Sequence, residues 1–242
     1  SPYVVGARPY YSPLEKGVEA ALAEREEALR KLARPLARRG IKVQVKTVWD
    51  YPAYEGIVRE VLRSKPDLVV AESHRRGLGA RLVLTNTDWQ LIRLCPAPLL
   101  FVKKKTPWRA ARVGAAIDPM HAYARPSRLD DRILEIASTV VQAWGGRLDV
   151  VHAYMPPSVY LPGIHGEAAV FYDPKFEREY RTEVRKAVQK ATAGMKLPAG
   201  QVHVEPGMPQ TVLPDLVRRL RADVLVMGAV SRRGLKRLFI GD

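Results

Sequence analysis

The sequence contains very little cysteine, since Cys95 is the single one among 242 residues. One cysteine excludes an internal disulfide and a metal site built from several cysteines. Long apolar runs are also missing: the longest are of strand length, so no segment is expected to span a bilayer. The N-terminal residues lack the order of basic, apolar and small residues that marks a signal peptide. We therefore expect a cytoplasmic protein without a membrane partner.

Patterns of catalytic residues are missing as well. No serine stands in a Gly-x-Ser-x-Gly sequence, no pair of carboxylates stands out at a strand end, and the 5 histidines show no ligand spacing. Cys95 precedes Pro96 at the end of a predicted helix, where a buried small apolar residue is expected rather than a reactive thiol. The sequence predicts neither an enzyme nor a metal site.

Acidic residues are scarce relative to basic ones, with 25 Asp and Glu against 40 Lys and Arg and a net charge of +15. A surplus of this size attracts polyanions without needing a specific site. The basic residues, however, fall mostly where predicted helices face water, and no aromatic residues interleave with them to stack bases. A basic factor that associates with nucleic acid stays as an alternative, but nucleic acid is not the expected partner.

What the sequence does contain is an internal repeat. Residues 67–78 (DLVVAESHRRGL) return as residues 223–235 (DVLVMGAVSRRGL), and residues 52–57 align with residues 209–214. The offset of roughly 157 residues corresponds to a whole domain. Each matched block is an apolar run followed by a polar, glycine-containing loop, which is typical of a buried parallel strand that opens onto a functional edge. We therefore expect two copies of one domain, with any chemistry just after these strands.

Strands and helices are predicted to alternate in both copies. In the first copy, the predicted helices cover residues 13–39, 54–63 and 88–94, and the strands cover residues 41–48, 67–71 and 99–102. In the second copy, the strands cover residues 113–117, 148–153, 201–204 and 223–227, and the helices cover residues 126–144, 175–195 and 212–221. Residues 156–172 are expected to be irregular, as a lid or a disordered loop. The fold class is α/β, with two tandem parallel sheets.

The repeat also sets the expected domain limits. We expect a first domain over residues 1–105, a short basic linker, and a second domain over residues 112–242. At the repeat offset, the first copy lacks its N-terminal strand and helix, which would precede Ser1. The second copy stops at Asp242, before its C-terminal helix and strand. Both domains are therefore expected to be incomplete in this chain.

Both copies resemble the universal stress protein family. The resemblance rests on Ile117 and Asp118 at the end of a strand, on the proline-containing start of the penultimate helix, and on residues 222–228 (ADVLVMG) with a loop running to Gly241. Residues 85–98 (TNTDWQLIRLCPAP) and the linker around Trp108 are similar to the tandem, E-type members. The resemblance implies a role in the stress response and a Rossmann-like sheet of the adenine nucleotide alpha hydrolase type, in which some members bind ATP.

Members that bind nucleotides have a loop of Gly, two residues, Gly, nine residues, Gly, and then Ser or Thr. In this chain the same spacing gives Gly228, Ser231, Gly241 and Asp242. Ser231 places a Cβ where small residues let backbone N–H groups approach phosphates. Asp242 would place a carboxylate beside the phosphates, a contact between like charges. The nucleotide loop of the second domain is therefore degenerate.

Two acidic residues bear on the same question. Asp118 matches the acid at the adenosine end of the site in ATP-binding relatives, although an aspartate before Pro119 is also a common turn former or helix cap. Glu72 stands in the first copy where Gly228 stands in the second, and it would face a phosphate with a negative charge. The first domain is therefore not expected to bind ATP.

The expected function is that of a non-enzymatic stress-response protein whose two domains form a binding platform with degenerate nucleotide loops. Its ligands would be unknown protein partners or a small apolar molecule, because residues 154–171 carry enough apolar side chains to cover a hydrophobic cavity. No cofactor is expected. The alternative is an ATP-binding stress sensor that uses only the second domain, which Gly228 and Gly241 favour and Asp242 opposes.

The resemblance also bears on assembly. Single-domain relatives commonly dimerise through the last strand of each sheet. The two copies here are expected to pair in the same way as a pseudo-dimer, with residues 99–102 contributed by the first copy. Pairing between two chains, as a homodimer, is the alternative.

Overall fold

The structure is a computed structural model that describes residues 8–72, 86–102, 108, 110–120, 128–156, 159–162, 168–171 and 174–229. The chain divides into two compact units, Ser1–Lys104 and Lys105–Asp242, and each is described by itself. In the described part of the chain, no helix combines the length and the apolar character that crossing a membrane requires.

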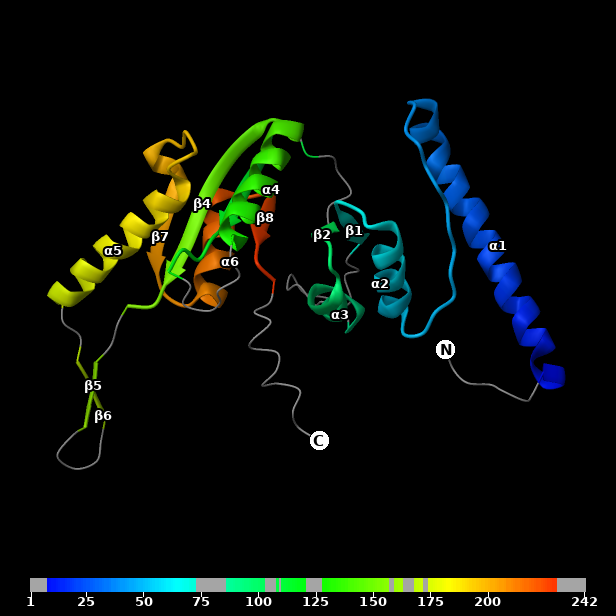
Figure 1. The fold of residues 1–242 in the computed structure, drawn as a ribbon, viewed down its shortest axis with the longest axis horizontal. Helices are drawn as coiled ribbons and strands as arrows, with labels where there is room; N and C mark the ends of the chain where they lie inside the picture. Colours follow the sequence, from blue (N-terminus) through cyan, green and yellow to red (C-terminus); the bar gives the residue numbers. More distant parts are fainter. Residues whose placement is uncertain are drawn as a thin grey trace. The chain divides into compact units, whose positions relative to one another are not determined.

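The second unit is built on a four-stranded parallel sheet (Figure 1). Its strands are β3 (Ala111–Ala116), β4 (Gly146–Tyr154), β7 (Val202–Pro206) and β8 (Val224–Met227), in the spatial order β7-β4-β3-β8. Ala115 of β3 lies beside Val150 of β4 on one side and Val226 of β8 on the other. The chain thus runs outward from β3 to β7 and then returns to place β8 on the far side of β3. The strand order reverses between β3 and β8, which defines the switch point of an open α/β sheet.

Helices cover both faces of this sheet (Figure 1). Helices α4 (Leu129–Trp144) and α5 (Pro174–Thr192) pack on one face, and α6 (Pro209–Leu220) packs on the other. The core on the α4 and α5 face includes Val113, Ala115, Val150, Ile133, Leu134 and Val188. On the α6 face, Val151 packs against Leu213 and Leu216. Because successive side chains of a strand point to opposite faces, the apolar residues of β3 and β4 supply core side chains to both faces, as a doubly covered parallel sheet requires.

The first unit contains α1 (Arg8–Arg38), α2 (Ala53–Ser64), β1 (Val69–Glu72), α3 (Asn86–Leu94) and β2 (Leu99–Val102). Strands β1 and β2 form a parallel pair with Val69 opposite Leu99, and α2 contacts α3. The segment after α1 is tied to α2 by an ion pair in which Lys46 Nζ lies 2.5 Å from Glu60 Oε2. All the helices and strands expected in this unit are present except one.

The exception is the strand predicted over residues 41–48, which is wrong: these residues form no strand. At the repeat offset they correspond to the segment that leads into β7 and to most of β7 itself, and among the described strands β7 is hydrogen-bonded to β4. Apolar and basic residues do alternate over residues 41–48, as they would in a strand. However, the described residues contain no neighbouring strand to accept and donate the backbone hydrogen bonds that a strand needs.

The irregular stretch predicted over residues 156–172 is also corrected. Strands β5 (Val159–Pro162) and β6 (Ala168–Phe171) pair there as an antiparallel hairpin, with Val159 opposite Phe171. The β-branched and aromatic residues in the two arms favour strand pairing, and this preference prevails over the proline and glycine that suggested a loop.

The alternating burial on α4 yields a first prediction. Leu134 is 6% exposed and belongs to the core on the α4 and α5 face. Replacing it with alanine, Leu134→Ala, is expected to lower the free energy of unfolding by about 2–5 kcal/mol through lost burial and a residual cavity. Urea unfolding followed by circular dichroism measures the change. The matched control on the exposed side of the same helix, Gln142→Ala, should stay within about 0.5 kcal/mol of the parent, and an equal loss in both variants would contradict this packing.

Candidate ligand pocket at the switch point

A cavity of about 340 Å³ lies where the strand order reverses, at the carboxyl end of β3. Its wall is formed by Ala116–Asp118 after β3, by the carboxyl half of β4, by the first turns of α4 and α6, and by the end of β8. Parallel strands separated by such a reversal direct their following loops to opposite faces of the sheet, so a crevice opens between the loops. The position of the cavity therefore follows from the topology.

The cavity wall is mainly apolar. Its apolar side chains include Ile117, Ile133, Leu213 and Met227, and its polar side chains are those of Asp118, Asp130 and Gln210. Among the described residues that line it, none is basic. Such a wall suits a molecule with an apolar body and few polar groups.

A hydrogen bond joins two parts of this wall. The backbone N–H of Asp118 donates to Asp130 Oδ1 over 2.9 Å, which fixes the chain after β3 to the first turn of α4. A second polar contact links β4 to the residue that follows β3, because His152 Nδ1 lies 2.9 Å from the carbonyl oxygen of Ile117. His152 is buried, with 3% of the residue exposed. The rim of the cavity is therefore held by hydrogen bonds from two elements.

Gly228 forms the wall at the end of β8 and touches α4. A Cβ at this position would lie 2.9 Å from Leu129 Cδ2, so the side chain of Leu129 fills the space that the glycine leaves. Leu129 also lines the cavity and packs against the core on the α4 and α5 face. In this structure the glycine accommodates a side chain of the protein itself.

The structure brings together two of the predicted site residues, since Asp118 and Gly228 both line the cavity. Ser231, Gly241 and Asp242 lie outside the described residues, so their roles stay predictions. Sequence reasoning missed Leu129, Asp130, Gln210 and Leu213. The one available signal was that α4 and α6 each follow a parallel strand, which brings their N-terminal turns to the same edge of the sheet as the ends of β3 and β8.

The first unit differs at the corresponding place. At the repeat offset Gly56 replaces Leu213, and a Cβ on Gly56 would lie 2.9 Å from Asp50 Oδ2. Asp50 in turn forms an ion pair with Arg59. Glu72, the counterpart of Gly228, is exposed at the end of β1. The first unit thus has charged groups where the second has an apolar wall.

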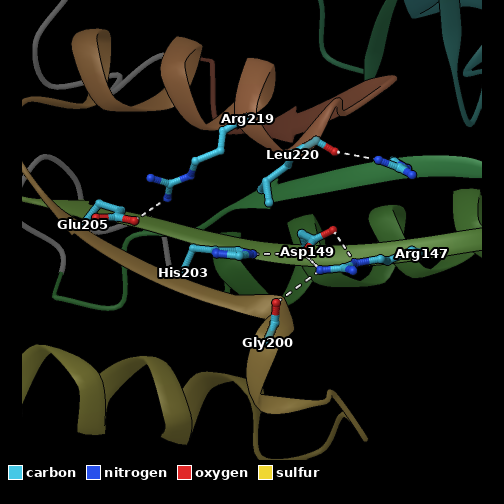
Figure 2. Close-up of polar contacts among 8 residues, drawn as sticks. Arg147, Asp149, Gly200, His203, Glu205, Arg219 and Leu220 are labelled. Atoms are coloured by element: carbon cyan, nitrogen blue, oxygen red, sulfur yellow. Dashed lines mark hydrogen bonds and ion pairs between the residues drawn. The ribbon is translucent and has the colours of Figure 1, made fainter.

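A separate polar cluster joins β4 to β7 (Figure 2), and none of its residues lines the cavity. Arg147 Nε and Nη2 donate to the two oxygens of Asp149 over 2.9 and 2.7 Å, and His203 Nε2 lies 2.9 Å from Asp149 Oδ1. Arg147 also donates to the carbonyl oxygen of Gly200 over 3.2 Å. Burial alone would raise the pKa of the Asp149 carboxyl, but the hydrogen bonds from Arg147 and His203 outweigh it and hold that pKa below its ordinary value. This cluster stabilises the outer strand pair.

No group of three or more His, Cys, Asp or Glu side chains is placed to hold a metal ion within the ranges that the structure describes.

Tyr154, at the end of β4, is 3% exposed and its ring lies 5.9 Å from that of Tyr180 on α5. Burial is the main cause that raises the pKa of the Tyr154 phenol. Neither tyrosine lines the cavity.

The parallel sheet, its helices on both faces and the crevice at the strand reversal define a Rossmann-like α/β fold, as the sequence predicted. The sequence model described as the universal stress protein family matches this chain twice, over residues 2–103 and 112–242. The chain therefore belongs to the universal stress protein family, a family of stress-response proteins, and the predicted family is confirmed. The domain limits at residues 105 and 112 stay predictions.

Individual relatives agree with this family. The chain is 27% identical to Universal stress protein E of Salmonella typhi over 231 residues, covering 93% of this chain and 70% of the relative. It is 26% identical to Universal stress protein E of Escherichia coli K12 over 229 residues, with coverage of 93% and 70%. A solved structure assigned to the universal stress proteins, from Pseudomonas aeruginosa UCBPP-PA14, superposes with a TM-score of 0.71 at 24% identity, covering 89% of this chain and 71% of that one. The structural similarity concerns the fold.

The Asp149 cluster yields a prediction on pH dependence. Since folding lowers the pKa of Asp149 below its ordinary value of 3.8, its stabilising contribution is complete above that value and is lost as the pH falls through the folded-state pKa. Asp149→Asn is expected to lower the free energy of unfolding by about 1–3 kcal/mol at pH 7. The difference from the parent should shrink as the pH is lowered below 4.

Urea unfolding of both proteins across this pH range checks the prediction. The control Asp215→Asn removes a carboxylate that is 61% exposed and pairs with Arg218 on the surface of α6. It should change the stability by no more than about 1 kcal/mol at any pH. A difference for Asp149→Asn that grows on acidification would show that the carboxylate is not stabilised as described.

Proposed function

We propose that this chain is a non-enzymatic stress-response protein that binds a small, largely apolar molecule in the switch-point cavity of its second unit. The observation that carries the proposal is the wall of the cavity, which is apolar apart from Asp118, Asp130 and Gln210. A volume of about 340 Å³ falls within the range of small-molecule sites. The few polar groups would orient a ligand that the apolar side chains hold by burial.

The chemistry of the wall supports binding rather than catalysis. Within its described part, the polar side chains are two carboxylates and one amide, with no histidine, cysteine, serine or lysine. A carboxylate can act as a base or a nucleophile, but the described wall offers no histidine, cysteine, serine or lysine to complete a catalytic pair with one. The proposal therefore assigns no reaction and no cofactor to the site.

The proposal keeps the tandem organisation as a platform in the cytoplasm. Large apolar side chains are exposed in the first unit, among them Leu32 at 72%, Trp49 at 70% and Tyr51 at 80%. Exposed apolar surface of this kind is what partner proteins or paired domains cover. The first unit would thus contribute protein contacts, including the pseudo-dimer pairing through β2. The second unit would contribute the cavity that binds the ligand.

Binding of a neutral apolar probe tests the cavity. N-phenyl-1-naphthylamine, which fluoresces when it leaves water, is expected to bind the protein saturably. Met227→Trp places a bulkier side chain in the cavity wall at a residue that is 50% exposed, and it should weaken probe binding about tenfold or more. Met155→Trp is the matched control, because Met155 is 42% exposed and does not line the cavity. Equal probe binding by all three proteins, or no probe binding by the parent, would contradict the proposed site.

A second candidate is an ATP-binding sensor that uses only the second unit. The observation that favours it is that Asp118 and Gly228, the two described residues of the predicted nucleotide site, line the same cavity. The sequence argues against it, because Asp242 stands where relatives that bind nucleotides have a hydroxyl residue.

Calorimetric titration with ATP, with and without magnesium, decides between the two candidates. We expect no saturable binding by the parent, and binding by Asp242→Ser, because the substitution removes a carboxylate that would repel the phosphates. Saturable binding by the parent at physiological ATP concentration would favour the sensor instead. Absence of binding by both proteins would mean that more than Asp242 prevents nucleotide binding.

A further inference from the structure

Two buried polar atoms on the central strand β4 have no hydrogen-bond partner among the described residues. They are Nε2 of His152 and the phenol oxygen of Tyr154, and each residue is only 3% exposed. Buried polar groups in folded proteins are nearly always hydrogen-bonded, because an unmet donor or acceptor in apolar surroundings costs free energy. Two such atoms two residues apart on one strand therefore indicate a place where a polar group from outside the chain can bind.

Both side chains lie on the same face of the sheet. Val150 belongs to the core on the α4 and α5 face, whereas Val151 packs on the α6 face. Because side chains alternate along a strand, His152 and Tyr154 share the face of Val150. The ring of Tyr154 agrees with this position, since it lies 5.9 Å from the ring of Tyr180 on α5. Residues two apart on a strand are separated by roughly 6.6 Å, so one small molecule can reach both polar atoms.

This place is separate from the switch-point cavity. The residues of β4 that line the cavity are Val151 and Ala153, which point to the opposite face of the sheet. Neither His152 nor Tyr154 lines the cavity. The two polar atoms thus belong to the space between β4 and α5, and the switch-point cavity does not account for them.

The surroundings of the two atoms on the helix side are apolar. Val184 and Val188 follow Tyr180 at steps of four residues, so the three side chains lie on one face of α5. Both valines are fully buried. An apolar setting of this kind disfavours a charged ligand and favours an uncharged one.

The contact with Ile117 determines the hydrogen-bonding role of the histidine. A carbonyl oxygen only accepts, so His152 Nδ1, at 2.9 Å from the carbonyl oxygen of Ile117, carries the proton and donates it. The other nitrogen of a neutral imidazole is then unprotonated, which makes Nε2 an acceptor. Tyr154 has the complementary role, because burial raises the pKa of its phenol and the hydroxyl keeps a proton to donate. The pair thus offers one acceptor and one donor.

These two roles select an uncharged hydroxyl group. A carboxylate has no proton to donate to Nε2, and an ammonium ion has no lone pair to accept the hydrogen bond from Tyr154, whereas a hydroxyl both donates and accepts. We propose that His152 and Tyr154 form a second ligand site, between β4 and α5, which binds the hydroxyl group of a small uncharged molecule. The inference goes beyond the proposed function and does not depend on the switch-point cavity.

The test compares phenol with toluene on the full chain, because toluene has nearly the same shape and lacks the hydroxyl. In protein with ¹⁵N-labelled histidine, phenol is expected to shift the nuclear magnetic resonance signal of His152 Nε2 saturably, and toluene is expected to leave it unchanged. Tyr154→Phe removes only the hydroxyl and should weaken phenol binding about fivefold or more. The matched control Tyr180→Phe removes the hydroxyl of the neighbouring ring and should leave the affinity for phenol unchanged.

Several outcomes would overturn the inference. One is a His152 signal that phenol does not shift, or that phenol and toluene shift equally. Another is an equal loss of phenol binding in Tyr154→Phe and Tyr180→Phe, since ring packing and not the Tyr154 hydroxyl would then hold the probe. Contact of Nε2 with water protons that phenol does not displace would identify an ordered water only.

A second measurement on Tyr154→Phe needs no ligand. Because the hydroxyl that it removes has no partner among the described residues, the variant should unfold in urea at a concentration no lower than the parent. A lower midpoint would show that the hydroxyl already has a partner in the folded protein, and it would overturn the inference. Loss of N-phenyl-1-naphthylamine binding contradicts the cavity alone, whereas loss of the phenol response at His152 contradicts this second site alone.

Discussion

The pairing of β3 with β4 on one side and with β8 on the other is the constraint from which the rest of the second unit follows. A parallel strand in the middle of a sheet must be covered on both faces, so α4 and α5 occupy one face and α6 the other. The same pairing reverses the strand order at β3. The crevice at this reversal is therefore a consequence of the strand order in the sheet, and its formation does not depend on a ligand.

Polar contacts in this unit serve two separate ends of the sheet. Arg147, Asp149 and His203 satisfy one another between β4 and β7, where a buried carboxylate would otherwise be costly. At the carboxyl end, the hydrogen bond from Asp118 to Asp130 fixes the rim of the cavity. The first type of contact stabilises the fold and the second shapes a site, although both use aspartates on or just after central strands. Burial, partners and distance from the cavity distinguish them.

Local pattern predicted the elements well wherever the neighbours that they need are present. Helix and strand alternation was read correctly over most of both copies, because apolar periodicity reports which face is buried. The strand predicted over residues 41–48 failed because strand formation depends on a neighbour, which periodicity does not reveal. The hairpin of β5 and β6 was missed because proline and glycine were given more weight than the β-branched residues beside them.

The sequence by itself determined the tandem repeat, the α/β class and the family. It also singled out Asp118 and Gly228 as candidate site residues. These depend on residues that are near one another in the chain or repeated at a fixed offset. Only the tertiary structure decided that both residues line one cavity with the first turns of α4 and α6, and that Leu129 fills the space above Gly228. The physical reason is that Leu129 and Gly228 lie more than 90 residues apart in the sequence. Their contact depends on how α4 packs on the sheet, and no local sequence pattern encodes that packing.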